Sequence, residues 1–184
     1  MGQKHTEAPD WDYPTTLDII REVPNTHLRG FIALSYVGGL RINEARWFQS
    51  KNMGIISTQR GDRVVFRVRN EKNPYRAFKD IPLNPITEKE YLGFINEAID
   101  HKQPNDFIFQ QQCERWYRLH IRKTLDIHPH ALRHLRVHHI DDRSIPGMES
   151  LTPRQYQDYF GWASISTSSK YQSRTRSMDL ANLF

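Results

Sequence analysis

The sequence is poor in cysteine and contains no long apolar run. Among its 184 residues Cys113 is the one cysteine, which excludes an internal disulfide and a multi-cysteine metal site. No apolar stretch approaches the roughly 20 residues that a membrane-spanning helix needs. Residues 1–14 lack the apolar core of a secretion signal and predict a polar tail or linker stump. We therefore expect one domain over residues 15–184, in a reducing cytoplasm.

Basic side chains outnumber acidic ones. The chain has 26 lysines and arginines against 21 acidic residues, a formal net charge of +5, and nine histidines in addition. A basic surface is typical of proteins that bind polyanions, most often nucleic acid. Apolar residues make up only 38% of the chain, but they occur in clusters that predict a folded core.

The apolar clusters predict an α+β domain that is mainly helical, with one small antiparallel sheet. Alternating apolar residues predict a hairpin of strands 62–69 and 76–83, with Lys72 at its tip. The predicted helices are 16–23, 28–37, 42–48, 86–100, 113–125, 130–142 and 152–160.

Capping residues mark several of these helix ends. Thr15 or Thr16 is expected to cap the first helix, and Thr87 with Glu90 to form a capping box for the helix at 86–100. Thr152 is the expected cap of the last helix, which Gly161 ends.

Four segments could carry chemistry. They are "GLRINE" around Arg41, the hairpin tip, "HALRH" from His130 to His134, and "FGWASISTSSKY", which ends at Tyr171. Each has an ordinary structural explanation when it is taken singly. Arg41 could pair with Glu44, for example, and a lysine on a hairpin tip is usually solvated.

As an ordered set these segments resemble the tyrosine recombinase family, the phage-type integrases. That family reads G-L-R-I-S-E at its first arginine, H-x-L-R-H at its second, and L-G-H-x-S-I-x-T-T-x-x-Y at its nucleophile. Trp162 stands at the position where the family more often has histidine. The resemblance spans roughly residues 15–175. It implies a helical catalytic domain of that type without the N-terminal core-binding domain.

The resemblance implies transesterification of DNA phosphodiesters without a metal or another cofactor. Tyr171 would attack the phosphorus and form a 3′-phosphotyrosine intermediate. Arg41 and Arg133 would bind the phosphate and stabilise the transition state, because guanidiniums fork onto two oxygens and stay charged.

The remaining implied roles concern protons and packing. Lys72 would protonate the 5′-oxygen as general acid, with Lys79 in the second strand as the rival. His130 would assist proton transfer or orient the phosphate. Trp162 would contact the phosphate through its indole N–H and pack against the tyrosine segment.

Double-stranded DNA is the expected partner. Four basic residues on the helix at 113–125, interleaved with Trp116 and Tyr117, are expected to contact phosphates: Arg115, Arg118, Arg122 and Lys123. Exchange between two duplexes implies four protomers on DNA, with a monomer as the alternative for the isolated domain. The apolar tail at 178–184 is predicted to pack on a neighbouring protomer. The host would be the cell of a virus, plasmid or other mobile element, or a bacterium or archaeon that encodes the protein in its chromosome.

Three alternatives stay open at this point. A type IB-like topoisomerase would nick and reseal DNA with nearly the same residues. A catalytically silent DNA-binding module would use the basic surface alone. A metalloprotein would use the stripe of His130, His134 and His138, although no further ligand is evident.

Overall fold

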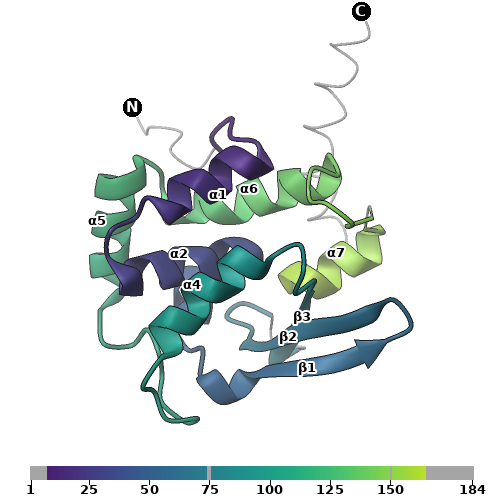
Figure 1. Cartoon of the computed structure of the whole chain (residues 1–184), viewed down its shortest axis with the longest axis horizontal. Helices are drawn as coiled ribbons and strands as arrows, with labels where there is room; N and C mark the ends of the chain where they lie inside the picture. The colour runs from purple at the N-terminus through teal and green to yellow at the C-terminus, as the bar shows by residue number, and fades with distance from the viewer. Residues whose placement is uncertain (1–7, 74–75, 150, 165–184) are drawn as a thin grey trace, which may run out of the picture.

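The computed structural model describes residues 8–73, 76–149 and 151–164. Figure 1 shows helices in layers above a small sheet. The elements are α1 Tyr13–Arg21, α2 Thr26–Val37, α3 Ile42–Arg46, a 3-10 turn at Ser50–Asn52, β1 Met53–Thr58, β2 Gly61–Arg69, β3 Phe78–Leu83, α4 Lys89–Ile99, α5 Glu114–Leu125, α6 Pro129–Asp141 and α7 Pro153–Phe160. The mainly helical α+β class predicted from the sequence is confirmed.

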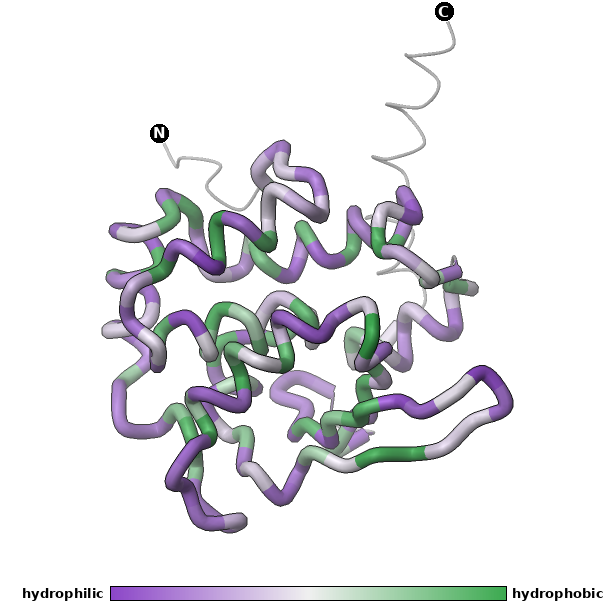
Figure 2. The backbone as a smooth tube through the Cα atoms, viewed as in Figure 1, coloured by the Kyte–Doolittle hydropathy of each residue, from purple (hydrophilic) through white to green (hydrophobic). Residues whose placement is uncertain are grey.

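Helix α2 forms the centre of the core, as its apolar sequence predicts. It packs against α4 and α6, and Figure 2 shows apolar residues along the central helices. The contact with α4 is close at Gly30, where a Cβ would lie 2.5 Å from Cβ of Ala98. None of the helices in the described part of the chain has the length and apolar character of a membrane-spanning segment.

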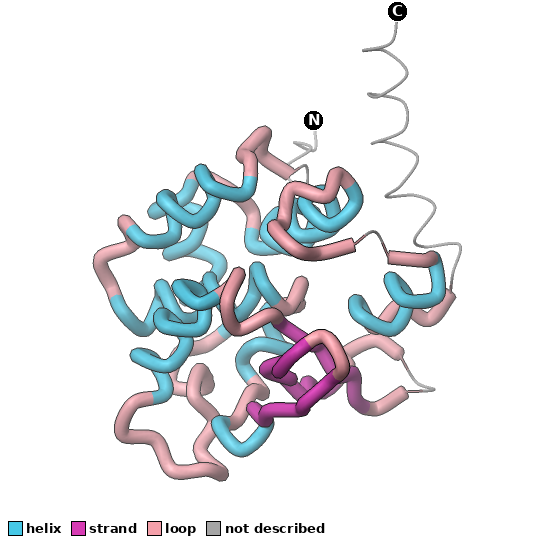
Figure 3. The backbone as a smooth tube through the Cα atoms, turned by 45° about the vertical axis from the view of Figure 1, so that its right-hand side comes forward, coloured by secondary structure: helices cyan, strands magenta, loops and turns pink. Residues whose placement is uncertain are grey.

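The sheet is antiparallel with the order β1-β2-β3, and Figure 3 shows it beside the helices. The predicted hairpin corresponds to β2 and β3, in which Val68 pairs with Lys79 and Phe66 with Ile81. Strand β1 is an addition to the prediction. Its residues from Gly54 to Thr58 are all exposed, so its sequence does not show the alternation that marks a half-buried strand.

Two predicted helix caps are wrong. The cap of α1 is Asp12, whose carboxylate accepts a hydrogen bond from the Thr15 backbone N–H at 2.8 Å. The helix therefore includes residues 13 and 14 of the predicted tail. The capping box at Thr87 does not form, because Glu90 pairs with Arg21 at 2.6 Å instead. At the first position the neighbouring Asp12 takes the cap, and at the second a tertiary partner, Arg21, takes Glu90 away from the local pattern.

The end of α7 and its attachment to the core follow the prediction more closely. Thr152 and Gln155 form a capping box at its start, and Gly161 ends it in the left-handed region with φ 67°. The Tyr159 hydroxyl donates to the Val37 carbonyl at 2.5 Å. It also accepts from Arg136 at 3.0 Å, and Arg136 pairs with buried Glu88 at 2.6 Å. These bonds tie α7 and α6 to the C-terminal end of α2.

Candidate active site

A glycine turn after α2 brings three elements together. Gly39 has φ 54°, which favours glycine, and a Cβ there would lie 2.2 Å from the Phe160 ring. The Gly39 carbonyl accepts a hydrogen bond from Nη1 of Arg133 at 2.6 Å. The end of α2, the middle of α6 and the end of α7 therefore meet at this turn, immediately before Arg41.

Glu44 is a fully buried carboxylate beside this turn. Its Oε2 accepts from the Arg41 backbone N–H at 2.9 Å, and its Oε1 accepts from Nη1 of Arg41 at 3.0 Å. Oε1 also accepts from the backbone N–H of Glu71 at 3.2 Å, which fixes the hairpin turn. Its other partners are Lys79, at 3.0 Å, and Nη1 of Arg133, at 3.9 Å.

The charge of Glu44 is strongly stabilised. Burial alone would raise its pKa, but Lys79, Arg133 and Arg41 together outweigh burial and lower the pKa of Glu44 to about 2. The carboxylate is therefore ionised at any physiological pH. The sequence alone predicts Glu44 only as a possible partner of Arg41. The available signal was its place in "GLRINE", three residues after the arginine.

Arg133 is buried behind the turn, together with Trp162. Its Nη2 donates to the Phe160 carbonyl at 2.8 Å. Its guanidinium lies 5.2 Å from the centre of the Phe160 ring and 5.8 Å from that of Trp162. Trp162 is itself buried and stacks on Phe160 with ring centres 5.1 Å apart. The structure thus places two sequence-predicted site residues in contact.

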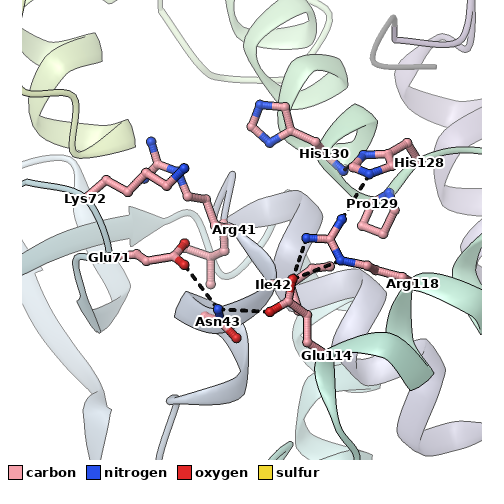
Figure 4. Close-up of a pocket in the computed structure, with 11 residues that line it drawn as sticks. Arg41, Ile42, Asn43, Glu71, Lys72, Glu114, Arg118, His128, Pro129 and His130 are labelled. Atoms are coloured by element: carbon pink, nitrogen blue, oxygen red, sulfur yellow. Dashed lines mark hydrogen bonds and ion pairs between the residues drawn. The ribbon is translucent and has the colours of Figure 1, made fainter. Parts of the chain in front are cut away.

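A cleft of about 170 Å³ lies at the start of α3, where Leu40 to Asn43 line it. Arg41 from the start of α3, Lys72 from the β2–β3 turn and His130 from the start of α6 all line it, as Figure 4 shows. These three predicted site residues come from segments far apart in the sequence. With the other lining residues, the cleft holds three cations, two imidazoles and two carboxylates: Arg41, Lys72, Arg118, His128, His130, Glu71 and Glu114.

The imidazole of His130 is neutral at physiological pH. Burial, followed by the neighbouring His134, Arg133 and Arg41, lowers the pKa of His130 to about 3. The ring centre of His134 lies 4.8 Å away. A neutral imidazole has one nitrogen that can accept a proton. His130 can therefore act as a proton acceptor, and an anion in the cleft would increase its basicity.

The two rival lysines lie in different environments. Lys72 is exposed at the hairpin turn and lines the cleft. Lys79 is buried in β3, with Nζ 3.0 Å from Oε2 of Glu44 and 3.3 Å from the Phe160 carbonyl. Burial lowers the pKa of Lys79 to about 7, against the opposing effect of Glu44. Of the two, the geometry favours Lys72 as the lysine that can reach a ligand in the cleft.

Polar side chains join the hairpin turn to α5 at the edge of the cleft. The carboxamide of Asn43 donates to Glu71 at 3.1 Å and to Glu114 at 3.2 Å. Glu114 also pairs with Arg118, whose Nη1 lies 3.1 Å from Nε2 of His128 (Figure 4). Arg118 is therefore held at the rim by neighbours on both sides.

Helix α5 presents its basic residues as predicted but not its aromatic ones. The four cations are exposed: Arg115, Arg118, Arg122 and Lys123. Tyr117 is a core residue, because its ring stacks on Phe31 at 3.7 Å and its hydroxyl donates to the Phe109 carbonyl at 2.9 Å. Trp116 stacks on His120 at 3.9 Å. The predicted interleaving of Tyr117 with the exposed cations of α5 is wrong.

Two predicted features lie outside the described residues. They are Tyr171 and the apolar tail at 178–184.

Within the described ranges, no group of three or more histidine, cysteine, aspartate or glutamate side chains is arranged to hold a metal. His139, the residue that follows the predicted stripe, hydrogen-bonds through its ring with the Tyr36 hydroxyl at 2.6 Å and the Trp11 carbonyl at 2.7 Å. The metalloprotein alternative gains no support from this part of the chain.

Comparison with solved structures finds similar folds. XerH site-specific recombinase bound to its difH substrate, in a pre-cleavage complex, has a TM-score of 0.65 and 16% identity over 90% of this chain and 50% of the XerH chain. XerH with palindromic difH, in a post-cleavage complex, has a TM-score of 0.69 and 15% identity over 97% of this chain and 53% of that one. XerA recombinase has a TM-score of 0.62 and 15% identity over 99% of this chain and 66% of its own.

These comparisons show the class of fold. The chain has the fold of the tyrosine recombinases XerH and XerA, as the resemblance of its motifs predicts. It spans about half the length of the XerH chains. No protein-family model matches the sequence, and no curated protein matches it significantly.

Proposed function

We propose that the chain is the catalytic domain of a DNA strand transferase, a site-specific recombinase or integrase of the tyrosine type. The observation that carries the proposal is the convergence of Arg41, Lys72 and His130 on one cleft, with Arg133 joined to Arg41 through Glu44. The fold supports it, and the solved XerH complexes hold that protein's difH substrate before and after cleavage. Double-stranded DNA is the proposed partner, with four protomers on two duplexes.

The cleft would bind one phosphodiester. Arg41 is part-exposed and directs its charge into the cleft, so it would bind the non-bridging oxygens. Arg133 would add positive charge from behind to the more highly charged transition state. Because its side chain is buried in this structure, a direct bond from Arg133 to the phosphate requires a local opening when DNA binds.

The proposed reaction balances without a metal. The Tyr171 hydroxyl loses its proton to the neutral imidazole of His130, and its oxygen forms a bond to phosphorus. The bond between phosphorus and the 5′-oxygen breaks, and the Lys72 ammonium gives that oxygen a proton. Strand joining reverses both steps: the attacking 5′-hydroxyl returns a proton to Lys72, and the departing tyrosine recovers one from His130.

A nicked suicide DNA substrate tests the nucleophile. We expect the wild-type chain to form a covalent adduct, mass spectrometry to place the DNA on Tyr171, and Tyr171→Phe to form none. An adduct in the phenylalanine variant would overturn the assignment. A topoisomerase-like enzyme would relax supercoils on an intact plasmid without producing recombinants from paired sites.

A modified leaving group tests the proton donor. We expect Lys72→Ala to cleave an ordinary DNA substrate about 100-fold or more slowly. The same variant should cleave a 5′-bridging phosphorothiolate at close to the wild-type rate, because a thiolate leaves without protonation. Lys89→Ala is the matched control, since Lys89 is exposed on α4 and does not line the cleft. A thiolate substrate that gives no rescue would exclude Lys72 as the general acid.

A further inference from the structure

The carbonyl of Phe160 connects α7 to the charged centre of the site. Phe160 is the last residue of α7, and its carbonyl accepts hydrogen bonds from two cations, Arg133 at 2.8 Å and Lys79 at 3.3 Å. Carbonyls at a helix C-terminus carry partial negative charge, so two cations there fix the position of that end. Lys79 also pairs with Glu44, which holds Arg41. One ammonium group thus joins the strand β3, the helix α7 and the arginine centre.

A lysine is an unexpected residue at this position of the sheet. Lys79 lies on the core-facing side of β3, and its neighbours on that side are buried and apolar: Phe66, Val68, Ile81 and Leu83. Burying an ammonium group costs free energy, and a well-packed apolar residue is often as stabilising as a buried ion pair, or more so. Stability therefore gives little reason for a lysine here, whereas its contacts with Glu44 and Phe160 do.

The end of α7 sets where the nucleophile segment starts. Gly161 turns the chain in the left-handed region, with its Cα so close to Asn70 that a Cβ would lie 2.5 Å from Nδ2. Trp162 then packs beneath Arg133. Tyr171 follows nine residues after Trp162. A shift of the Phe160 carbonyl would move the starting point of this segment relative to the arginines.

We propose that Lys79 is a positioning residue, which couples the end of α7 to the Glu44–Arg41–Arg133 centre and so aligns the segment that leads to Tyr171. This inference rests on the proposed function, because it assigns Lys79 a part in aligning the same nucleophile. Lys79 acts through Phe160 and Glu44 and does not touch DNA.

The charge of Lys79 is sensitive to its surroundings, which supports this coupling. The charged groups that face it are Glu44 from α3, Arg133 from α6 and Arg41 from the turn before α3; β2 offers the apolar side chain of Val68, and α7 the Phe160 carbonyl. Burial lowers its pKa to about 7. A phosphate anion beside Arg41 would offset the guanidinium charges and favour the ammonium form, which makes the stronger hydrogen bond to Phe160.

The test compares Lys79→Met with wild type in single-turnover cleavage of the suicide substrate. Displacements of about 1 Å can cost roughly 100-fold in rate, so we expect cleavage at saturating DNA to slow by about 10- to 100-fold. DNA affinity should change by less than about 3-fold, because Arg41 and the exposed cations remain. Lys89→Met serves as the matched surface control.

Two further measurements separate positioning from other roles. The 5′-phosphorothiolate substrate should not rescue Lys79→Met, whereas it would rescue a lost general acid. Lys79→Gln keeps an N–H donor for Phe160 and should recover part of the rate; it also carries the test if the methionine variant fails to fold. Wild-type cleavage with an unchanged rate in both Lys79 variants would overturn this inference alone. An absence of any wild-type adduct would instead overturn the proposed function.

Discussion

Replacing Glu44 by glutamine should destabilise the domain strongly, because the buried carboxylate balances three cations. The folded-state pKa of Glu44 is about 2, compared with 4.5 for a free side chain. That shift corresponds to a preference for the ionised form of about 3 kcal/mol. Removing one member of a buried ion pair typically costs roughly 3–5 kcal/mol, because the remaining charges lose their partner. Both arguments predict a loss of about 3 kcal/mol for Glu44→Gln.

Urea and thermal unfolding at pH 7 measure this loss. For a domain of this size, about 3 kcal/mol lowers Tm by roughly 6–12 °C. The matched control is Glu90→Gln. Glu90 makes a comparable pair with Arg21 at 2.6 Å, but both side chains are about half exposed, at 51% and 43%. An exposed pair contributes roughly 0–1 kcal/mol, so this variant should unfold close to wild type.

The pH dependence of the same experiment tests the cause. Because the folded-state pKa of Glu44 lies below its unfolded value, its stabilisation is complete above pH 4.5 and disappears as the pH falls towards 2. The difference between wild type and Glu44→Gln should therefore shrink across that window. A loss below about 1 kcal/mol at pH 7, or a difference that does not change with pH, would refute the reasoning.

Three other predictions follow from single residues. His130 should remain neutral in NMR titrations down to about pH 5. Its low pKa should also reduce the stability of the fold as the pH falls below 6.5, because only the unfolded chain then binds the proton. Protonation of the folded ring near pH 6 would contradict both expectations. Gly39→Ala should lower the free energy of unfolding in urea by roughly 1–3 kcal/mol or more, because of the φ of 54° and the contact with Phe160. Gly93→Ala, in open space on α4, should instead raise it by about 0.4–1 kcal/mol. Equal effects of the two substitutions would argue against the turn geometry. Arg122→Ala should weaken DNA binding and reduce the slope of log K against log salt by about 0.9 in filter-binding titrations. An unchanged slope would argue against a contact between α5 and the DNA phosphates.

Local signals in the sequence predicted several elements correctly. The apolar character of α2 predicted a central buried helix, and alternation in β2 and β3 predicted their hairpin. Thr152 and Gly161 predicted both ends of α7, because a capping hydroxyl and a left-handed glycine act within one turn of the helix. The order of the motifs also predicted the class of fold.

Predictions failed where two local signals competed, or where burial and exposure depended on the tertiary structure. Thr15 looks like a helix cap in the sequence, but Asp12 performs that role. Tyr117 lies four and eight residues before the apolar Ile121 and Leu125, a helical spacing that places it on the buried face of α5, but its position beside Trp116 in a basic helix favoured the surface interpretation. Strand β1 is exposed along nearly its whole length, so it has no apolar alternation to recognise.

The sequence by itself determined which residue types are present for the proposed phosphate chemistry and in what order they occur. It named Arg41, Arg133 and His130, and it left the hairpin lysine open between Lys72 and Lys79. Only the tertiary structure separated these lysines, by exposing the first at the cleft and burying the second against Glu44. Packing decides burial, and burial decides which charges meet each other and which meet a ligand. That is why Glu44 became recognisable as the centre of the site only after α2, α3, β3, α6 and α7 were brought together.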